Sequence, residues 1–247
     1  MKPLPFGNHI LRLMRGLILA IQFLTRLPTP TLANFRPNDL AFAAVWFPLV
    51  GLLLGGLISA AVWLGCRVDP WLGALLGLLA WVGLTGALHL DGLADLADAL
   101  GAAHGDRERL LAVLADPHLG VFGATALALQ LLSKLVLLML LAKAGLFWPL
   151  LLIPAWARLG PLLWARLPSL KPGLGERFAW NIGLGSVWLW MALLAAASVG
   201  APALLAAPLL ILAWRTYLLA RLGGMTGDAL GAGVEWVESG LLLALVL

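Results

Sequence analysis

The sequence predicts an all-α protein, a polytopic integral membrane helical bundle with about seven transmembrane helices and an N-terminal interfacial helix. Three observations predict this class. Hydrophobic residues make up 62% of the 247 residues and charged residues only 11%, whereas a soluble domain carries roughly 25% charged residues. Several apolar runs approach or exceed the ~18–20 residues that cross a bilayer core. These runs are rich in Leu, Ala and Gly without strict alternation, which favours helices over a barrel.

The elements follow from hydropathy in chain order. Arg12 and Arg15 precede a short apolar stretch at 16–24, and no small-residue cleavage site follows it. We therefore expect a retained interfacial or half-inserted helix rather than a cleaved signal. The expected spans cover 41–65, 70–88, 121–142, 146–167, 183–200, 203–222 and 230–247. No convincing repeat or linker interrupts them, so residues 1–247 are expected to form a single membrane-embedded domain.

The charge distribution predicts how the bundle lies in the membrane. The long polar connections at 89–120, 168–182 and 223–229 fall on one face together with the N-terminal segment. Eleven Lys and Arg side chains lie on that face, against Arg67 and Lys143 on the other. The positive-inside rule makes the polar face cytoplasmic, so we expect a multi-pass protein of the cell inner membrane. No clustered basic soluble face indicates a nucleic-acid partner.

An acidic motif at 88–98 is the strongest chemical signal. Asp91, Asp95 and Asp98 are spaced i, i+4 and i+7, which puts them on one helical face. Their mutual repulsion is relieved by a divalent cation, and Mg²⁺ prefers hard oxygen ligands shared with substrate phosphates. The alternative is a solvated helix end, where acids favour the dipole. His89 is a general base or phosphate contact, or simply an interfacial histidine.

Other polar residues extend this candidate site. Asp116, just before a span, is a fourth metal ligand or an N-cap. Lys134 and Arg158 lie within spans, where ionisable groups are costly and face a cavity or a partner. We expect them to contact substrate phosphate; the alternative is an internal ion pair with Glu235 or Glu238.

Two glycine-bearing connections are candidate substrate contacts. In the loop 171–177, the backbone at Gly173 and Gly175 and the side chain of Arg177 are suited to phosphate, although most such loops are only turns. In the connection 223–228, Thr226 and Asp228 are assigned to substrate binding. Glu235, seven residues after Asp228, shares a helical face with it and would complete a carboxylate pocket.

Several ordered motifs together resemble the cobalamin synthase, or adenosylcobinamide-GDP ribazoletransferase, family over nearly the whole chain. The matching stretches are Phe-Leu-Thr-Arg-Leu-Pro at 23–28, Phe-Pro-Leu-Val-Gly at 47–51, His-Leu-Asp-Gly-Leu-Ala-Asp at 89–95 with Asp98, 116–123, and Gly-Gly-Met-Thr-Gly-Asp-Ala-Leu-Gly at 223–231. The chain departs from the family pattern at Ala99, where glycine is frequent. It also departs at Ala115 and His118, where basic residues are frequent.

The resemblance implies a membrane transferase that joins GDP-activated adenosylcobinamide to α-ribazole or α-ribazole 5′-phosphate. It releases GMP and uses Mg²⁺, in a late step of cobalamin biosynthesis. With the residues above, it implies catalytic Asp91, His89 and Asp95, and metal ligands Asp91, Asp95, Asp98 and Asp116. It implies substrate contacts from Lys134, Arg158, Gly173, Gly175, Arg177, Thr226, Asp228 and Glu235. A homo-oligomer, or a complex with other cobalamin-assembly enzymes, is compatible with this reading.

Two alternatives remain open at this point. A CDP-alcohol phosphotransferase or a membrane prenyltransferase also uses aspartate-bound Mg²⁺. The chain lacks the Asp-Gly-x-x-Ala-Arg run and the paired Asp-Asp-x-x-Asp motifs of those families. An ion-coupled transporter would use Lys134, Arg158, Glu235 and Glu238 as a relay. Transporters often show internal repeats and broken midplane helices, whereas these acids gather at one face.

Overall fold

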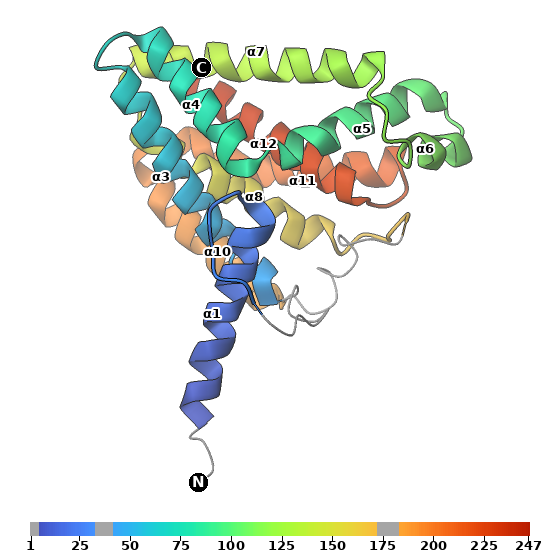
Figure 1. Ribbon diagram of the computed structural model, residues 1–247, viewed down its shortest axis with the longest axis horizontal. Helices are drawn as coiled ribbons and strands as arrows, with labels where there is room; N and C mark the ends of the chain where they lie inside the picture. Colours follow the sequence, from blue (N-terminus) through green and yellow to red (C-terminus); the bar gives the residue numbers. More distant parts are fainter. Residues whose placement is uncertain (1–4, 33–41, 172–182) are drawn as a thin grey trace.

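The computed structural model describes residues 5–32, 42–171 and 183–247, and their regular elements are all helices (Figure 1). In chain order they are α1 (Pro5–Leu24), α3 (Phe47–Gly65), α4 (Pro70–Thr85), α5 (Leu88–Ala103), α6 (Arg107–Val113), α7 (Val121–Lys143), η1 (Trp148–Leu151), α8 (Ile153–Trp164), α10 (Leu184–Ala197), η2 (Ser198–Gly200), η3 (Pro202–Ala206), α11 (Ala207–Arg221) and α12 (Gly227–Val246). The predicted all-α class is confirmed.

Four helical segments among the described residues are long and apolar enough to cross a membrane. They are α3, α7, the continuous stretch of η3 and α11, and α12. The α4–α5 pair makes a fifth crossing if it is counted as one broken span, because its two helices meet at 85°. The polytopic membrane character is therefore confirmed.

The expected spans at 146–167 and 183–200 contain shorter helices than the sequence predicts. The first divides into η1 and the 12-residue α8, and the second contains the 14-residue α10. Prolines explain the first division, since Pro149 and Pro154 lie at the starts of η1 and α8. A proline has no N–H to donate to the preceding turn.

Helix α8 forms the centre of the bundle. Nearly all of its residues are buried, and α3, α10, α11 and α12 pack around it. Close approach is set by glycines on α3: a Cβ at Gly51 would lie only 2.5 Å from the Ala155 Cα, and one at Gly55 would meet the backbone of Leu151. Small residues at such contacts are typical of helix packing in membranes. The large apolar side chains on the outside include Trp63, Leu129 and Leu209, where lipid would cover them.

The N-terminal helix is present as expected. Its C-terminal part packs on α3 and buries Leu19, Ala20 and Leu24. Its other end projects away from the bundle towards the N-terminus (Figure 1). A short turn at 66–69 joins α3 to α4, and Asp69 caps α4 by accepting a hydrogen bond of 2.7 Å from the Trp71 N–H.

Candidate active site

A sharp bend between α4 and α5 positions the acidic motif. Gly86 and Ala87 adopt left-handed backbone conformations, with φ of 60° and 59°. Such a conformation is rare for alanine, and it ends α4 and turns the chain by 85° into α5. His89 and Asp91 therefore lie in the first turn of a new helix, beside α12, instead of continuing along the axis of α4.

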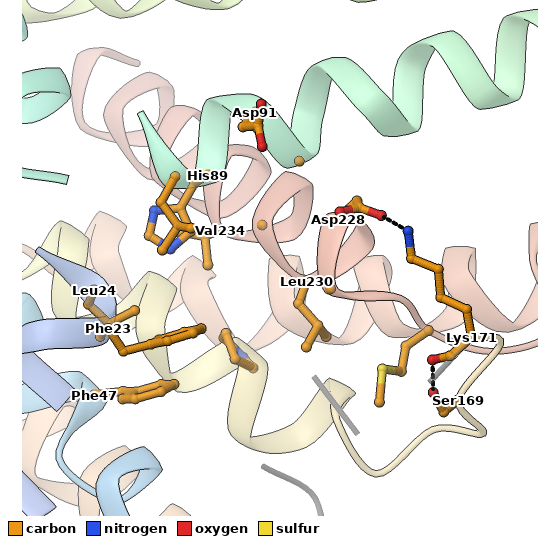
Figure 2. A pocket seen from close by; sticks show the side chains of 16 residues that line it. Phe23, Leu24, Phe47, His89, Asp91, Ser169, Lys171, Asp228, Leu230 and Val234 are labelled. Atoms are coloured by element: carbon orange, nitrogen blue, oxygen red, sulfur yellow. Dashed lines mark hydrogen bonds and ion pairs between the residues drawn. The ribbon is translucent and has the colours of Figure 1, made fainter. Parts of the chain in front are cut away.

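Beside this turn lies a cavity of about 300 Å³. Figure 2 shows Asp91, Asp228 and Lys171 towards one end and Phe23, Leu24 and Phe47 at the other, with His89 and Leu230 between them. The complete lining is Phe23, Leu24, Phe47, Leu88, His89, Asp91, Gly92, Pro161, Ser169, Lys171, Met225, Gly227, Asp228, Leu230, Gly231 and Val234. The cavity is thus charged at one end and apolar at the other.

The charged end depends on a very close approach of α5 and α12. A Cβ at Gly92 would lie 2.7 Å from the Asp228 carbonyl oxygen, and one at Gly231 would lie 3.4 Å from the His89 Cα. A side chain at Gly92 would therefore separate the helices that carry Asp91 and Asp228. This contact explains the glycine of the acidic motif, whereas at Gly231 the contact is an ordinary van der Waals distance.

Lys171 reaches the cavity from the segment after α8. That segment is held by two backbone hydrogen bonds, from Met225 to Pro168 at 2.8 Å and from Leu170 to Met225 at 3.0 Å. The Lys171 ammonium donates to the Leu114 carbonyl at 3.0 Å and lies 3.1 Å from Asp228 Oδ2. The angles of this ion pair do not make a hydrogen bond, so the buried Oδ2 keeps an unused acceptor position.

The three aspartates predicted on one face of α5 lie in three different environments, because α5 runs from the cavity towards α7. Asp91 is exposed to the cavity, and Asp95 is half-buried and outside the lining. Asp98 is buried and accepts hydrogen bonds from the Gly120 N–H at 2.7 Å and the Gly123 N–H at 2.8 Å. Both Asp98 oxygens therefore anchor the start of α7 in this structure, and the metal contact predicted for Asp98 stays a prediction.

Two further predicted residues also hold local structure. Thr226 is buried and caps α12, its hydroxyl accepting from the Ala229 N–H at 3.1 Å. Asp116 is exposed and accepts from the His118 N–H at 3.0 Å, with the His118 ring nitrogen at 2.6 Å. The backbone hydrogen bond, and then the ring contact, lower the pKa of the Asp116 carboxyl. The carboxylate turns back on its own loop and does not line the cavity.

Lys134, Arg158 and Glu235, which the sequence predicts as substrate contacts, form an internal network in this structure. The Lys134 ammonium donates to Glu238 Oε2 at 2.6 Å and lies 2.7 Å from Glu235 Oε2. Arg158 Nη1 donates to Glu238 Oε1 and, at 3.2 Å, to the Pro154 carbonyl. All four charged side chains are at least 95% buried, and none of them lines the cavity.

The physical reason for this pairing is electrostatic. In a low-dielectric interior, unpaired charges are far more costly than paired ones, so two cations and two carboxylates on α7, α8 and α12 neutralise each other. Gln130 completes the network by donating to Glu235 Oε2 at 2.6 Å and to Ser239 Oγ at 2.8 Å. The internal ion pairing that the sequence left as the alternative is what the geometry shows.

Most of the predicted phosphate loop lies outside the described part of the chain. Gly173, Gly175 and Arg177 lie outside the described residues. Lys171, just before them, was part of the same basic loop and does reach the cavity.

A bound magnesium ion would have to share its shell with substrate. Among the described residues, no group of three or more His, Cys, Asp or Glu side chains could hold a metal ion. Asp91 and Asp228 nevertheless share one end of the cavity wall, and Asp228 Oδ2 has no hydrogen-bond donor. Two carboxylates with phosphate and water oxygens are a normal Mg²⁺ shell, so the residues present fit this ion.

Sequence reasoning did not single out the apolar half of the cavity. Phe23 and Phe47, whose rings are parallel with centroids 5.8 Å apart, come from α1 and α3. Both residues lie in stretches that carry the family resemblance, so the family motifs are the sequence signal that could have identified them. Ser169 had no comparable signal, because its place follows from the pairing of its neighbours with Met225.

Comparison with known proteins gives the family. A family model described as cobalamin-5-phosphate synthase matches residues 16–246. Proteins named adenosylcobinamide-GDP ribazoletransferase are similar over almost their whole length. That of Novosphingobium aromaticivorans is 56% identical, over 95% of this chain and 97% of that protein. That of Laribacter hongkongensis is 58% identical over the same shares, and that of Pseudomonas aeruginosa PAO1 is 43% identical over 95% and 98%. No solved structure matches. Since the family model covers nearly the entire chain, this protein belongs to the cobalamin-5-phosphate synthase family.

Proposed function

We propose that this chain is an adenosylcobinamide-GDP ribazoletransferase. It transfers the phosphorylated adenosylcobinamide of the GDP-activated donor onto α-ribazole or α-ribazole 5′-phosphate, and it forms adenosylcobalamin or its 5′-phosphate with GMP. The observation that carries the proposal is the end-to-end similarity to relatives of that name. The motifs of the resemblance also supply both ends of one cavity, with Phe23 and Phe47 at one end and Asp91 and Asp228 at the other.

The charged end is assigned to the diphosphate of the donor. Lys171 binds a phosphate oxygen, because its ammonium is already held at the cavity wall beside Asp228. Asp91 and Asp228 would hold Mg²⁺ against the same diphosphate. When bound, this ion neutralises phosphate charge and makes the phosphorus easier to attack. Substrate oxygens complete its shell, which accounts for a site with few protein ligands.

The acceptor is assigned to the remainder of the cavity. Its hydroxyl oxygen attacks the phosphorus that carries cobinamide, and the bond from that phosphorus to the bridging oxygen of GMP breaks. His89, on the wall between the two ends, takes the hydroxyl proton. The apolar wall, including Phe23, Phe47 and Leu230, limits the access of water, which would otherwise compete with the acceptor as nucleophile.

The reaction is assigned to the cytoplasmic face of the cell inner membrane. The sequence supports this through its excess of Lys and Arg on the connections at 89–120, 168–182 and 223–229. Lys171 and Asp228 both belong to these connections, so the charged end of the cavity would open to the compartment that supplies nucleotides.

The family assignment favours this transferase over the phosphotransferase and prenyltransferase alternatives. The internal pairing of Lys134, Arg158, Glu235 and Glu238 gives the transporter alternative no independent support, because each charge has a fixed partner. No second function is proposed.

Purified protein in lipid nanodiscs tests the proposal directly. Incubation with adenosylcobinamide-GDP, α-ribazole and Mg²⁺ is expected to release GMP and form adenosylcobalamin in equal amounts. Omission of the acceptor, or chelation of Mg²⁺, is expected to stop the reaction. Wild-type protein that forms no GMP under these conditions would overturn the proposal. Activity that survives complete chelation would show that the reaction does not need Mg²⁺.

A further inference from the structure

A second cavity, of about 360 Å³, lies at the far end of α5. It is enclosed by the end of α5, the start of α6, the end of α11 and the segment after α8. Its lining residues are Leu100, Ala103, Gly105, Asp106, Arg107, Leu110, Leu170, Tyr217, Arg221 and Leu222. It shares no lining residue with the first cavity, and the site described above does not use it.

Two arginines give this cavity a cationic wall. Arg107 is the first residue of α6 and Arg221 the last of α11. Both are exposed, and neither forms an ion pair with any described residue. A guanidinium presents a fork of donors that suits phosphate oxygens, and also the O6 and N7 acceptors of guanine. Two unpaired guanidinium groups in one concave site are therefore suited to an anionic nucleotide.

An aromatic ring stands beside them. Tyr217, the only tyrosine of the chain, lies one turn before Arg221 on α11 and lines the cavity. Its ring stacks on Trp214 with centroids 5.1 Å apart, which holds it in a fixed orientation. A fixed aromatic ring is a stacking platform for a nucleobase. A site that binds only inorganic phosphate would not need an aromatic ring.

The two cavities adjoin at the segment after α8 and lie at different places along the same helix, α5. Leu170 lines the second cavity, while its neighbours Ser169 and Lys171 line the first. On α5, Asp91 and Leu100 are nine residues apart, or about 14 Å at 1.5 Å per residue. That separation is comparable to an extended nucleoside diphosphate. A ligand with its diphosphate at Asp91 and Lys171 could thus place its nucleoside at Arg107, Tyr217 and Arg221.

We propose that the second cavity binds the guanosine nucleotide end of the donor, with Arg107 and Arg221 contacting the nucleotide and Tyr217 supporting the base. This inference rests on the proposed function for the identity of the nucleotide. It assigns the diphosphate and the nucleoside of the donor to separate cavities on either side of residues 169–171. It also gives GMP, the leaving product, a site apart from the acceptor.

Direct binding of labelled GMP to purified protein in neutral-lipid nanodiscs is the primary test, because it requires no turnover. Arg107→Gln and Arg221→Gln are each expected to weaken binding about tenfold, through loss of charge-assisted hydrogen bonds. Tyr217→Leu is also expected to weaken it about tenfold, through loss of stacking. Arg109→Gln is the matched control, because Arg109 is an exposed arginine of α6 that does not line the cavity. It is expected to bind GMP as the wild type does.

Kinetics give a second readout. The Arg107 and Arg221 variants are expected to raise the KM for the donor while leaving the KM for α-ribazole unchanged. Equal loss of binding in Arg109→Gln would overturn the proposal, since it would show only general charge attraction. Inorganic phosphate that displaces GMP completely, with no effect of Tyr217→Leu, would also overturn it.

The phosphate could also come from a lipid headgroup, so nanodiscs with anionic lipid are a separate arm. GMP affinity independent of anionic lipid supports the nucleotide assignment, and competitive loss of GMP binding would assign the cavity to a headgroup instead. Failure of the proposed function has a different signature. Wild-type protein would then release no GMP from donor and acceptor, whatever its affinity for free GMP.

Discussion

Two acidic regions of the same helix, α12, have opposite environments. Asp228, in its first turn, faces a cavity and keeps one oxygen without a hydrogen-bond donor. Glu238, ten residues later, is completely buried, and its two oxygens are held by Arg158 and Lys134. The first carboxylate retains capacity for a ligand, and the second has none to spare. Position along one helix thus separates a carboxylate that lines a cavity from one that neutralises buried cations.

The largest effect is expected from removing the charge that faces the cavity. Asp91→Asn should lower the rate of ribazole transfer about 100-fold or more, because a preorganised charge near the reacting phosphate is lost. Stability should barely change, since Asp91 is exposed. Asp69→Asn is the matched control: Asp69 caps α4 away from the cavity, and asparagine caps equally well. Near-native transfer by Asp91→Asn would show that the carboxylate facing the cavity is not needed for the reaction.

The next largest effect is expected on stability, in the buried network. Glu238→Gln leaves Arg158 and Lys134 with one carboxylate fewer, and should lower the free energy of unfolding by about 3 kcal/mol. Denaturation in detergent, followed by circular dichroism, measures it. The double variant Lys134→Met/Glu238→Gln should lose less than the sum of the two single variants, because it leaves no excess charge. Additive losses would show that these groups do not act as a network.

Asp98 tests an intermediate case. Asp98→Ala removes the acceptor of two N–H groups at the start of α7, and should destabilise the protein by about 1–2 kcal/mol. Asp98→Asn keeps one acceptor oxygen and should retain far more activity than Asp91→Asn. If Asp98→Asn instead abolishes transfer without changing stability, the residue binds metal as the sequence predicts, and the anchoring role is secondary.

The smallest effect is expected at Asp116. Asp116→Asn should change the rate of transfer by no more than about twofold, since surface substitutions away from a site are usually mild. Its exposed carboxylate contacts only His118 among the hydrogen bonds described. Purified variant and wild type can be compared at equal concentration in the transfer assay. A loss as large as that of Asp91→Asn would instead support the prediction that Asp116 is a metal ligand.

The fold class was predictable because it follows from composition and hydropathy, which need no knowledge of contacts. The bend before α5 was not, since Gly86-Ala87 is an ordinary pair of small residues and alanine seldom adopts a positive φ. The division around α8 could be anticipated only in part. Its prolines were visible in the sequence, but its burial depends on the helices around it.

The candidate site was predictable where residues face a common cavity. Asp91, His89 and Asp228 were chosen from short motifs and do line one cavity. Helical spacing placed Asp98 on the same face as Asp91, but spacing does not say which helix covers each turn of that face. Lys134 and Arg158 were ambiguous for the same reason, because a charge in a span is compatible with a ligand or with a partner on another helix.

The cavity joins the beginning and the end of the chain, since Phe23 and Leu24 come from α1 and Gly227 to Val234 from α12. During membrane insertion, α7 and α8 are made before the helix that carries Glu235 and Glu238. If the helices insert in the order of synthesis, Lys134 and Arg158 would enter the membrane without their partners, at a cost of about 2.5–3.5 kcal/mol each on translocon insertion scales. Insertion of α12 would then neutralise both cations and close the wall of the cavity. The maturation of this protein would thus have a single decisive step, in which its stability and its active site are acquired together.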